Sequence, residues 1–403
     1  MDNFYKKASQ LGHDVEKLKK GESYDHIVMV KDIEELKSLL RDNQEHSVHS
    51  SGPGGVDEES HPTLALKLAK KAQDYVFTDS PLSDEDRLHL KSSFPMAVRT
   101  MSLPNKTLPA GYAWDLGTST SPVVVNLGTL TMEAGSSIKI ANTVLSLSVE
   151  TLVRNAGTTS GANYDLGIFG VTGVTPPQAG QGIAGGTGAK GKAGDCQSGG
   201  GIAGNDGGPG ATGHNGGTGL QGLTGGQGLA ALTATIKIGS GGIGGSANQF
   251  VITTRSGDGG QGGQGGKGGN GGNGGDGGNG ATCGCEHTSG GNGGNGGNGG
   301  NGGDGGIGGN AIKGNDIYVT VPTGQASKVI KLPVTAIPGN GGLAGPGGNP
   351  GSGGSGGKRG GASGCPKGSN GKNGNPGSAG DAGKNGPAGT QTGAPGNIYV
   401  TES

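Results

Sequence analysis

The stretch GDGGQGGQGGKGGNGGNGGDGG, from Gly257 to Gly278, places glycine at every third position and a second glycine beside most of these. A period of three residues is typical of a polyproline-II-type helix, whose backbone makes no internal hydrogen bonds. Because glycine has no side chain, a bare face along such a helix lets another backbone approach closely enough to exchange hydrogen bonds. The stretch therefore predicts a run that packs against glycine-rich neighbours.

Six runs keep this phase, and strand-like segments separate them into three pairs. The runs are Gly167–Gly194, Gly201–Gly228, Gly257–Gly278, Gly290–Gly308, Gly339–Gly360 and Gly368–Gly389. We expect a fold class that is mainly β or irregular: a bundle of six antiparallel polyglycine-II helices in three hairpins, attached to a β-sandwich or β-solenoid, with a small α-containing N-terminal segment. The third and fourth runs carry two bare glycine faces, so the second hairpin is expected in the middle.

Composition divides the chain into three expected domains. Only nine of the 98 glycines precede residue 156, which leaves 89 in the remaining 248 residues. Residues 1–100 form a charged α/β segment with apolar residues at helical spacing, residues 101–160 alternate like short β-strands, and residues 161–403 form the glycine-rich bundle with interleaved strands. With 29% hydrophobic residues, the chain cannot build one large core.

The glycine-rich part, roughly residues 165–396, resembles the polyglycine-II proteins. The segment GCPKGSNGKNGNPGSAGDAGKNGPAG (364–389) is similar to snow flea antifreeze proteins, and the Gly-Gly-Asn runs resemble the receptor-binding domain of the tail-fibre adhesins of T-even-type phages. The phage resemblance implies a non-enzymatic protein that presents the tip of a rigid bundle to a cell-surface receptor, either a protein or a glycan. A secreted or lysis-released toxin that uses the bundle for targeting is the first alternative. The antifreeze resemblance implies ice binding as the second.

All four cysteines fall in the breaks between paired runs: Cys196, Cys283, Cys285 and Cys365. One intervening residue disfavours a bond between Cys283 and Cys285, so each is expected to pair with one of the other two. Free thiols and a zinc site that includes His287 remain alternatives. The same breaks supply the candidate binding residues of the tip: Asp195, Gln197, Glu286, His287 and Lys367.

No sequence motif indicates catalysis, so we expect no enzyme activity, cofactor or metal. The net charge of −1 indicates no nucleic-acid partner, and membrane contact is expected only for the toxin alternative. The charged N-terminal segment lacks the apolar stretch of a signal peptide. We therefore expect synthesis in the cytoplasm and action outside the cell, on a virion, on a surface appendage or after release, in an unknown oligomeric state.

Overall fold

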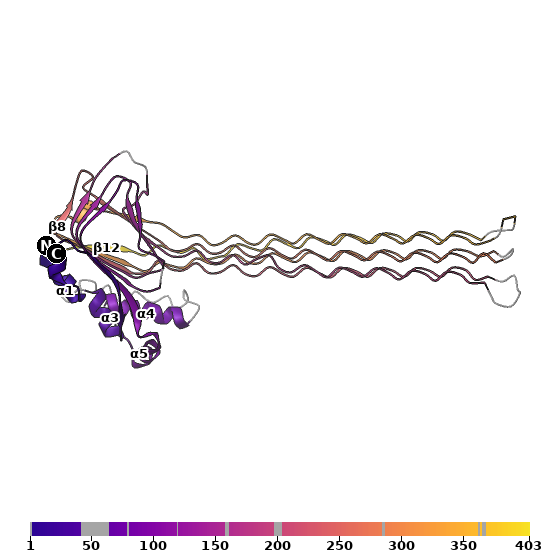
Figure 1. Ribbon diagram of the computed structural model, residues 1–403, viewed down its shortest axis with the longest axis horizontal. Helices are drawn as coiled ribbons and strands as arrows, with labels where there is room; N and C mark the ends of the chain where they lie inside the picture. The colour runs from indigo at the N-terminus through magenta and orange to yellow at the C-terminus, as the bar shows by residue number, and fades with distance from the viewer. Residues whose placement is uncertain are drawn as a thin grey trace.

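The computed structural model describes residues 2–41, 64–78, 80–118, 120–157, 161–196, 204–283, 287–361, 363–364 and 368–403. It has two parts (Figure 1). The body contains the helices and strands, and both chain ends lie there. The arm consists of the glycine runs, which leave the body side by side and extend away from it.

Five α-helices lie in the described part of the body, all before residue 91. They are α1 (Asp2–Gln10), α2 (Val15–Lys19), α3 (Ile33–Leu40), α4 (Leu64–Thr78) and α5 (Asp84–Leu90). Side chains cap three of their N-termini, since Asp14, Asp32 and Ser83 each accept hydrogen bonds from backbone N–H groups in the first turn. Ser83 stands directly before Asp84 and Glu85, a pattern that is typical of a helix N-terminus.

A seven-stranded sheet takes its strands from the whole length of the sequence. Its order is β1 (Tyr24–Val30), β2 (Met96–Leu108), β4 (Val123–Met132), β6 (Leu145–Arg154), β8 (Ala234–Gly244), β10 (Ile317–Val321) and β12 (Ile398–Glu402). Only the β1–β2 pair is antiparallel; every other neighbour is parallel. Strands from residues 24 to 402 thus share one sheet.

A second sheet has five strands, all parallel. Its order is β11 (Val329–Pro333), β9 (Phe250–Arg255), β7 (Leu166–Phe169), β5 (Ser137–Ala141) and β3 (Ala113–Asp115). From β2 onward the chain alternates between the two sheets, so each strand pairs with the strand after next. The long glycine-rich segments connect β7 to β8, β9 to β10 and β11 to β12 along the chain.

Two large apolar clusters hold the body together, and a third, of Phe4, Ala8 and Leu18, joins α1 to α2. The larger joins inward-facing residues of both sheets, including Leu147 and Ile236 from the seven-stranded sheet and Ile140 and Phe250 from the other. The smaller covers the opposite face of the seven-stranded sheet with α3, α4 and α5. Burial of these side chains compensates for the low overall apolar content.

We number the arm runs in chain order: run 1 (170–194), run 2 (204–229), run 3 (257–280), run 4 (289–311), run 5 (337–360) and run 6 (368–390). None of them belongs to an α-helix or β-strand. Runs 1, 3 and 5 lead away from the body and runs 2, 4 and 6 return (Figure 1). Backbone N–H donors recur every third residue, as in Gly182 to Lys267 O (2.8 Å) and Gly185 to Asn270 O (2.7 Å). Neighbouring backbones therefore satisfy groups that a lone run would leave to water.

These hydrogen bonds place runs 3 and 4 in the middle of the arm. Run 3 bonds to runs 1, 2, 4 and 5, and run 4 bonds to runs 2, 3, 5 and 6. The contact is close, because a Cβ on Gly269 would overlap the carbonyl oxygen of Ile183, and one on Gly299 would overlap that of Gly348. This central position is the one predicted from the two bare faces of runs 3 and 4.

Asparagine side chains add a second set of bonds between runs. The Oδ1 atom of Asn270 accepts the N–H of Asn349 (3.0 Å), and that of Asn273 accepts the N–H of Ser352 (3.0 Å). Run 4 repeats this toward run 6, for example from Lys372 N–H to Asn292 Oδ1 (2.8 Å). Asparagine in the triplet therefore supplies an acceptor for an exposed backbone donor, a role that the sequence analysis did not recognise.

The expected fold class is wrong. The chain is an α/β protein with two parallel-rich sheets of seven and five strands and few helices, and neither a β-sandwich or β-solenoid nor an attached bundle of six antiparallel polyglycine-II helices describes it. The turn residues between consecutive strands lie where the chain crosses from one sheet to the other. Paired strands are therefore separated in the sequence by long insertions. The arm is not simply antiparallel either, because run 1 bonds to run 3, and run 3 bonds to run 5, in parallel.

Candidate functional site at the arm tip

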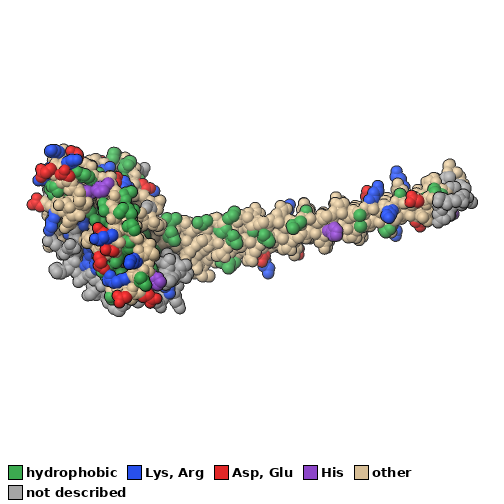
Figure 2. Space-filling view, turned by 60° about the horizontal axis from the view of Figure 1, so that its bottom comes forward, with side chains coloured by type: hydrophobic (Ala, Val, Ile, Leu, Met, Phe, Trp, Pro, Cys, Tyr) green, Lys and Arg blue, Asp and Glu red, His purple; other side chains and the backbone are tan. Residues whose placement is uncertain are grey.

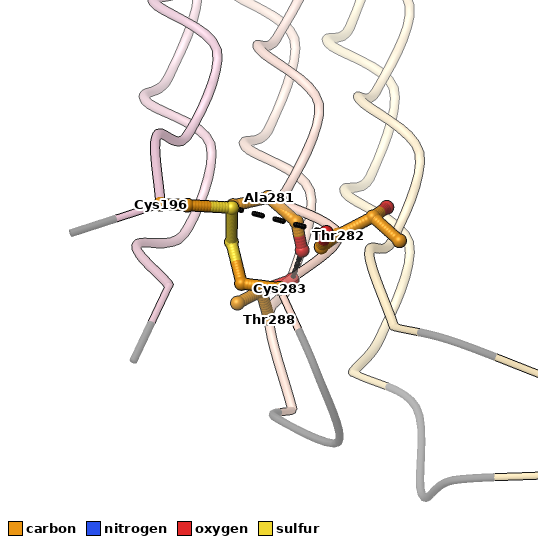
Figure 3. Close-up of a disulfide and its surroundings, with 5 residues drawn as sticks. All are labelled: Cys196, Ala281, Thr282, Cys283 and Thr288. Carbon is orange, nitrogen blue, oxygen red and sulfur yellow. Dashed lines mark hydrogen bonds between the residues drawn. A yellow bond between two sulfur atoms is a disulfide. The ribbon is translucent and has the colours of Figure 1, made fainter. Parts of the chain in front are cut away.

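A disulfide closes the far end of the arm. Cys196 follows run 1 and Cys283 follows run 3, and their Cα atoms lie 5.7 Å apart across a sequence separation of 87 residues. Cys196 is exposed, whereas Cys283 is buried with 7% of its surface exposed (Figure 3). This bond confirms one of the pairings that the sequence predicts.

Polar contacts join the ends of the runs beside this disulfide. The hydroxyl of Thr288 donates to the carbonyl of Ala281, which joins the end of run 3 to the start of run 4 (Figure 3). The N–H of Asn205 donates to Asp195 O (3.2 Å), and the N–H of Ser289 donates to Asp206 Oδ1 (2.6 Å). The first two hairpins are thus tied together at their tips.

The structure brings Asp195, Cys196, Cys283 and His287 to the same end of the arm, and the side chains of Asp195 and His287 are exposed there. Five of the expected tip residues lie outside the described residues: Gln197, Cys285, Glu286, Cys365 and Lys367. In the described part of the tip, Cys196 and Cys283 are bonded to each other, and no group of three or more potential ligands that could hold a metal occurs anywhere in the described chain. The zinc alternative therefore has no support from these residues.

Five exposed basic side chains surround the distal part of the arm. They are Lys190, Lys192, Lys358, Arg359 and Lys372, and we call them the distal basic residues (Figure 2). Among the described residues none of them forms an ion pair, and the described acidic residues near them are Asp195, Asp206 and Asp276. The five residues could not be grouped from the sequence, because they belong to three runs that only the fold brings together.

Exposed apolar side chains of the arm lie nearer the body than the distal basic residues do. Val174, Ile183 and Leu223 are 76%, 84% and 65% exposed, and all three come from runs 1 and 2. Within the described residues, the arm therefore changes from an apolar flank near the body to a basic surface near the tip.

A buried histidine, His13, lies in a polar cluster of the body. His13 is 3% exposed; its Nδ1 lies 2.7 Å from Ser102 Oγ and its Nε2 3.3 Å from Thr100 Oγ1. Burial, with a smaller contribution from His26, lowers the pKa of His13 to about 4. Its contacts join the segment after α1 to β2, so the cluster has a structural explanation and indicates no catalytic group.

Comparisons with protein-family models, curated proteins and solved structures find no match to this chain. The resemblance to polyglycine-II proteins therefore stays a prediction. Among the described helices, none combines the length and the apolar character needed to cross a membrane.

Proposed function

We propose that this protein is a non-enzymatic binding protein that applies the tip of its arm to an anionic receptor on a cell surface. The observation that supports this proposal is the group of distal basic residues beside a tip that a disulfide closes. The chain is nearly neutral overall, with a net charge of −1, and its five distal basic residues outnumber the three acidic residues described near them.

The shape of the arm suits such a role. At its body end, every run connects within a few residues to a strand of one of the two sheets. Repeated backbone hydrogen bonds keep the runs in register along their length. At about 3 Å per residue, the 24 residues of run 3 place the tip about 70 Å from the body. This separation exceeds the Debye length of about 8 Å at physiological salt several-fold, so the tip charges act on a receptor independently of the body.

The experiment measures binding of fluorescently labelled intact chain to a panel of cultured cells by flow cytometry. One variant replaces Lys190, Lys192, Lys358 and Lys372 with Gln. Its matched control replaces four exposed lysines of the body with Gln, which changes the net charge equally: Lys6, Lys17, Lys20 and Lys31. We expect binding of the distal variant to fall about tenfold or more, with a weaker dependence on salt, and binding of the body variant to stay near that of the original chain.

Equal loss in both variants would contradict a role for the tip, because it would show a response to net charge alone. Dye release from liposomes at concentrations that do not saturate cells would instead favour the toxin alternative. Inhibition of ice growth without any cell binding would favour the ice-binding alternative.

A further inference from the structure

Asparagine followed by glycine is the sequence most prone to spontaneous deamidation, and this chain contains twelve such pairs. The asparagines are Asn215, Asn270, Asn273, Asn279, Asn292, Asn295, Asn298, Asn301, Asn340, Asn370, Asn373 and Asn385. In this reaction the backbone nitrogen of the following glycine attacks the side-chain carbonyl carbon, its proton passes to solvent, and ammonia leaves. Water then opens the cyclic imide to aspartate or isoaspartate. The glycine N–H must therefore be free to react.

In the folded arm, eleven of the twelve glycines use this N–H in a hydrogen bond to a neighbouring run. Gly271, after Asn270, donates to Asn349 O (2.8 Å), and Gly296, after Asn295, donates to Asn375 O (2.8 Å). The side-chain oxygen of Asn270 is also engaged, since it accepts the N–H of Asn349. The hydrogen bonds between runs thus keep the glycine N–H and the asparagine side-chain carbonyl apart.

The twelfth pair is Asn340 and Gly341, near the body end of run 5. Within the described part of the chain, the N–H of Gly341 donates no hydrogen bond, and the exposed side chain of Asn340 has no hydrogen-bond partner. We infer that Asn340 is the site at which the folded protein deamidates, while its other Asn-Gly pairs are protected until the arm opens.

The register between runs 5 and 6 explains why Gly341 differs. N–H groups on the same edge of run 5 are capped by asparagines of run 6: Ala344 by Asn385 (2.9 Å), Gly356 by Asn373 (2.9 Å) and Arg359 by Asn370 (2.9 Å). Continuing this antiparallel register places Ala388 opposite Gly341. Alanine has no acceptor in its side chain, so this donor is left uncapped.

Deamidation at Asn340 would add a negative charge at the foot of run 5. The isoaspartate product would also add one carbon to the backbone, which shifts the three-residue phase of run 5 relative to runs 3 and 4. We therefore expect modified molecules to exchange backbone hydrogens faster in run 5 than unmodified ones.

The test follows deamidation of each asparagine by peptide mass spectrometry after incubation of the intact chain at mildly alkaline pH. In the folded chain Asn340 should react first, and in urea all twelve pairs should react at similar rates. The variant Ala388→Asn supplies the missing cap and should slow the reaction at Asn340 about two- to tenfold, the range expected from one hydrogen bond. The matched control Ala382→Asn, on the same edge of run 6, lies opposite Gly347, which follows Pro346, and should leave the rate at Asn340 unchanged.

Circular dichroism would verify that both variants fold like the original chain. Equal rates at Asn340 and Asn273 in the folded protein would overturn the inference. So would an unchanged rate at Asn340 in a folded Ala388→Asn protein.

Discussion

Replacing Gly269 with valine tests whether bare glycine faces hold the arm together. A Cβ on this residue would overlap the carbonyl oxygen of Ile183, so any side chain must push run 3 away from run 1. Four backbone hydrogen bonds surround this point, each 2.7 or 2.8 Å long: Gly269 to Gly217 O, Gly300 to Gly269 O, Gly182 to Lys267 O and Gly185 to Asn270 O. Loss of two of them, at about 1–3 kcal/mol for each buried donor left unpaired, would lower the free energy of unfolding by about 2–6 kcal/mol.

Asn273→Val is the matched control, four residues further along the same run. Its exposed side chain contributes one acceptor, to the N–H of Ser352, and water can replace that acceptor. We expect a cost of about 0.5 kcal/mol. Guanidinium unfolding followed by circular dichroism gives the free energies, and hydrogen exchange read at Gly182 and Gly185 shows whether the damage is local. Equal costs for the two variants, or unchanged exchange at Gly182 in the Gly269 variant, would refute the reasoning.

Two further changes test the tip and the body. Cys196→Ser removes a cross-link that spans 87 residues, and the chain-entropy model gives the lost stability as about 4–5 kcal/mol. Hydrogen exchange should rise mainly at the distal ends of runs 1 and 3. Uniform exchange along the arm would contradict this prediction. For His13, whose folded pKa of about 4 lies below the unfolded value of 6.5, the unfolded state binds the proton first as pH falls. Stability should thus decrease by at most about 3 kcal/mol between pH 6.5 and 4 and level off below that range, as measured by urea unfolding. His13→Asn should remove most of this slope, and an unchanged slope would show that other groups cause it.

Much of the local structure could be predicted from the sequence. The apolar spacing around Ile33 and Leu36 and the cap at Ser83 indicate helices that the structure contains. The isolated strand-like segments Ile317–Val321 and Phe250–Thr254 correspond to β10 and β9. Local periodicity and capping act over a few residues, and a sequence displays them directly.

Strand pairing could not be predicted in the same way. One partner of β6 is β8, which begins 80 residues after β6 ends, and the intervening strand β7 belongs to the other sheet. Glycine and asparagine between strands suit a turn within one sheet and a crossing to another sheet equally, so the pattern does not specify which strands pair. The distal basic residues escaped notice for a similar reason, since Lys190, Arg359 and Lys372 come together only through the register of the runs.

That two of the breaks meet at one end of the arm could be predicted from the sequence. Cysteines in every break, together with runs of similar length, pointed to one shared end, and the Cys196–Cys283 bond confirms that two breaks meet. The role of asparagine was missed, because a polar residue in a triplet indicates solvent exposure. Only the register shows that Asn270 and Asn292 accept backbone donors from the next run.

Hydroxyl-radical footprinting of the intact chain on cells that bind it tests the proposed function most directly. If the tip engages the receptor, Asp195, His287 and the distal basic residues should become protected, while exposed side chains of the body such as Leu88 keep the reactivity that they have in free solution. Protection of the body helices with an unchanged tip would contradict the proposal that the arm presents the binding surface.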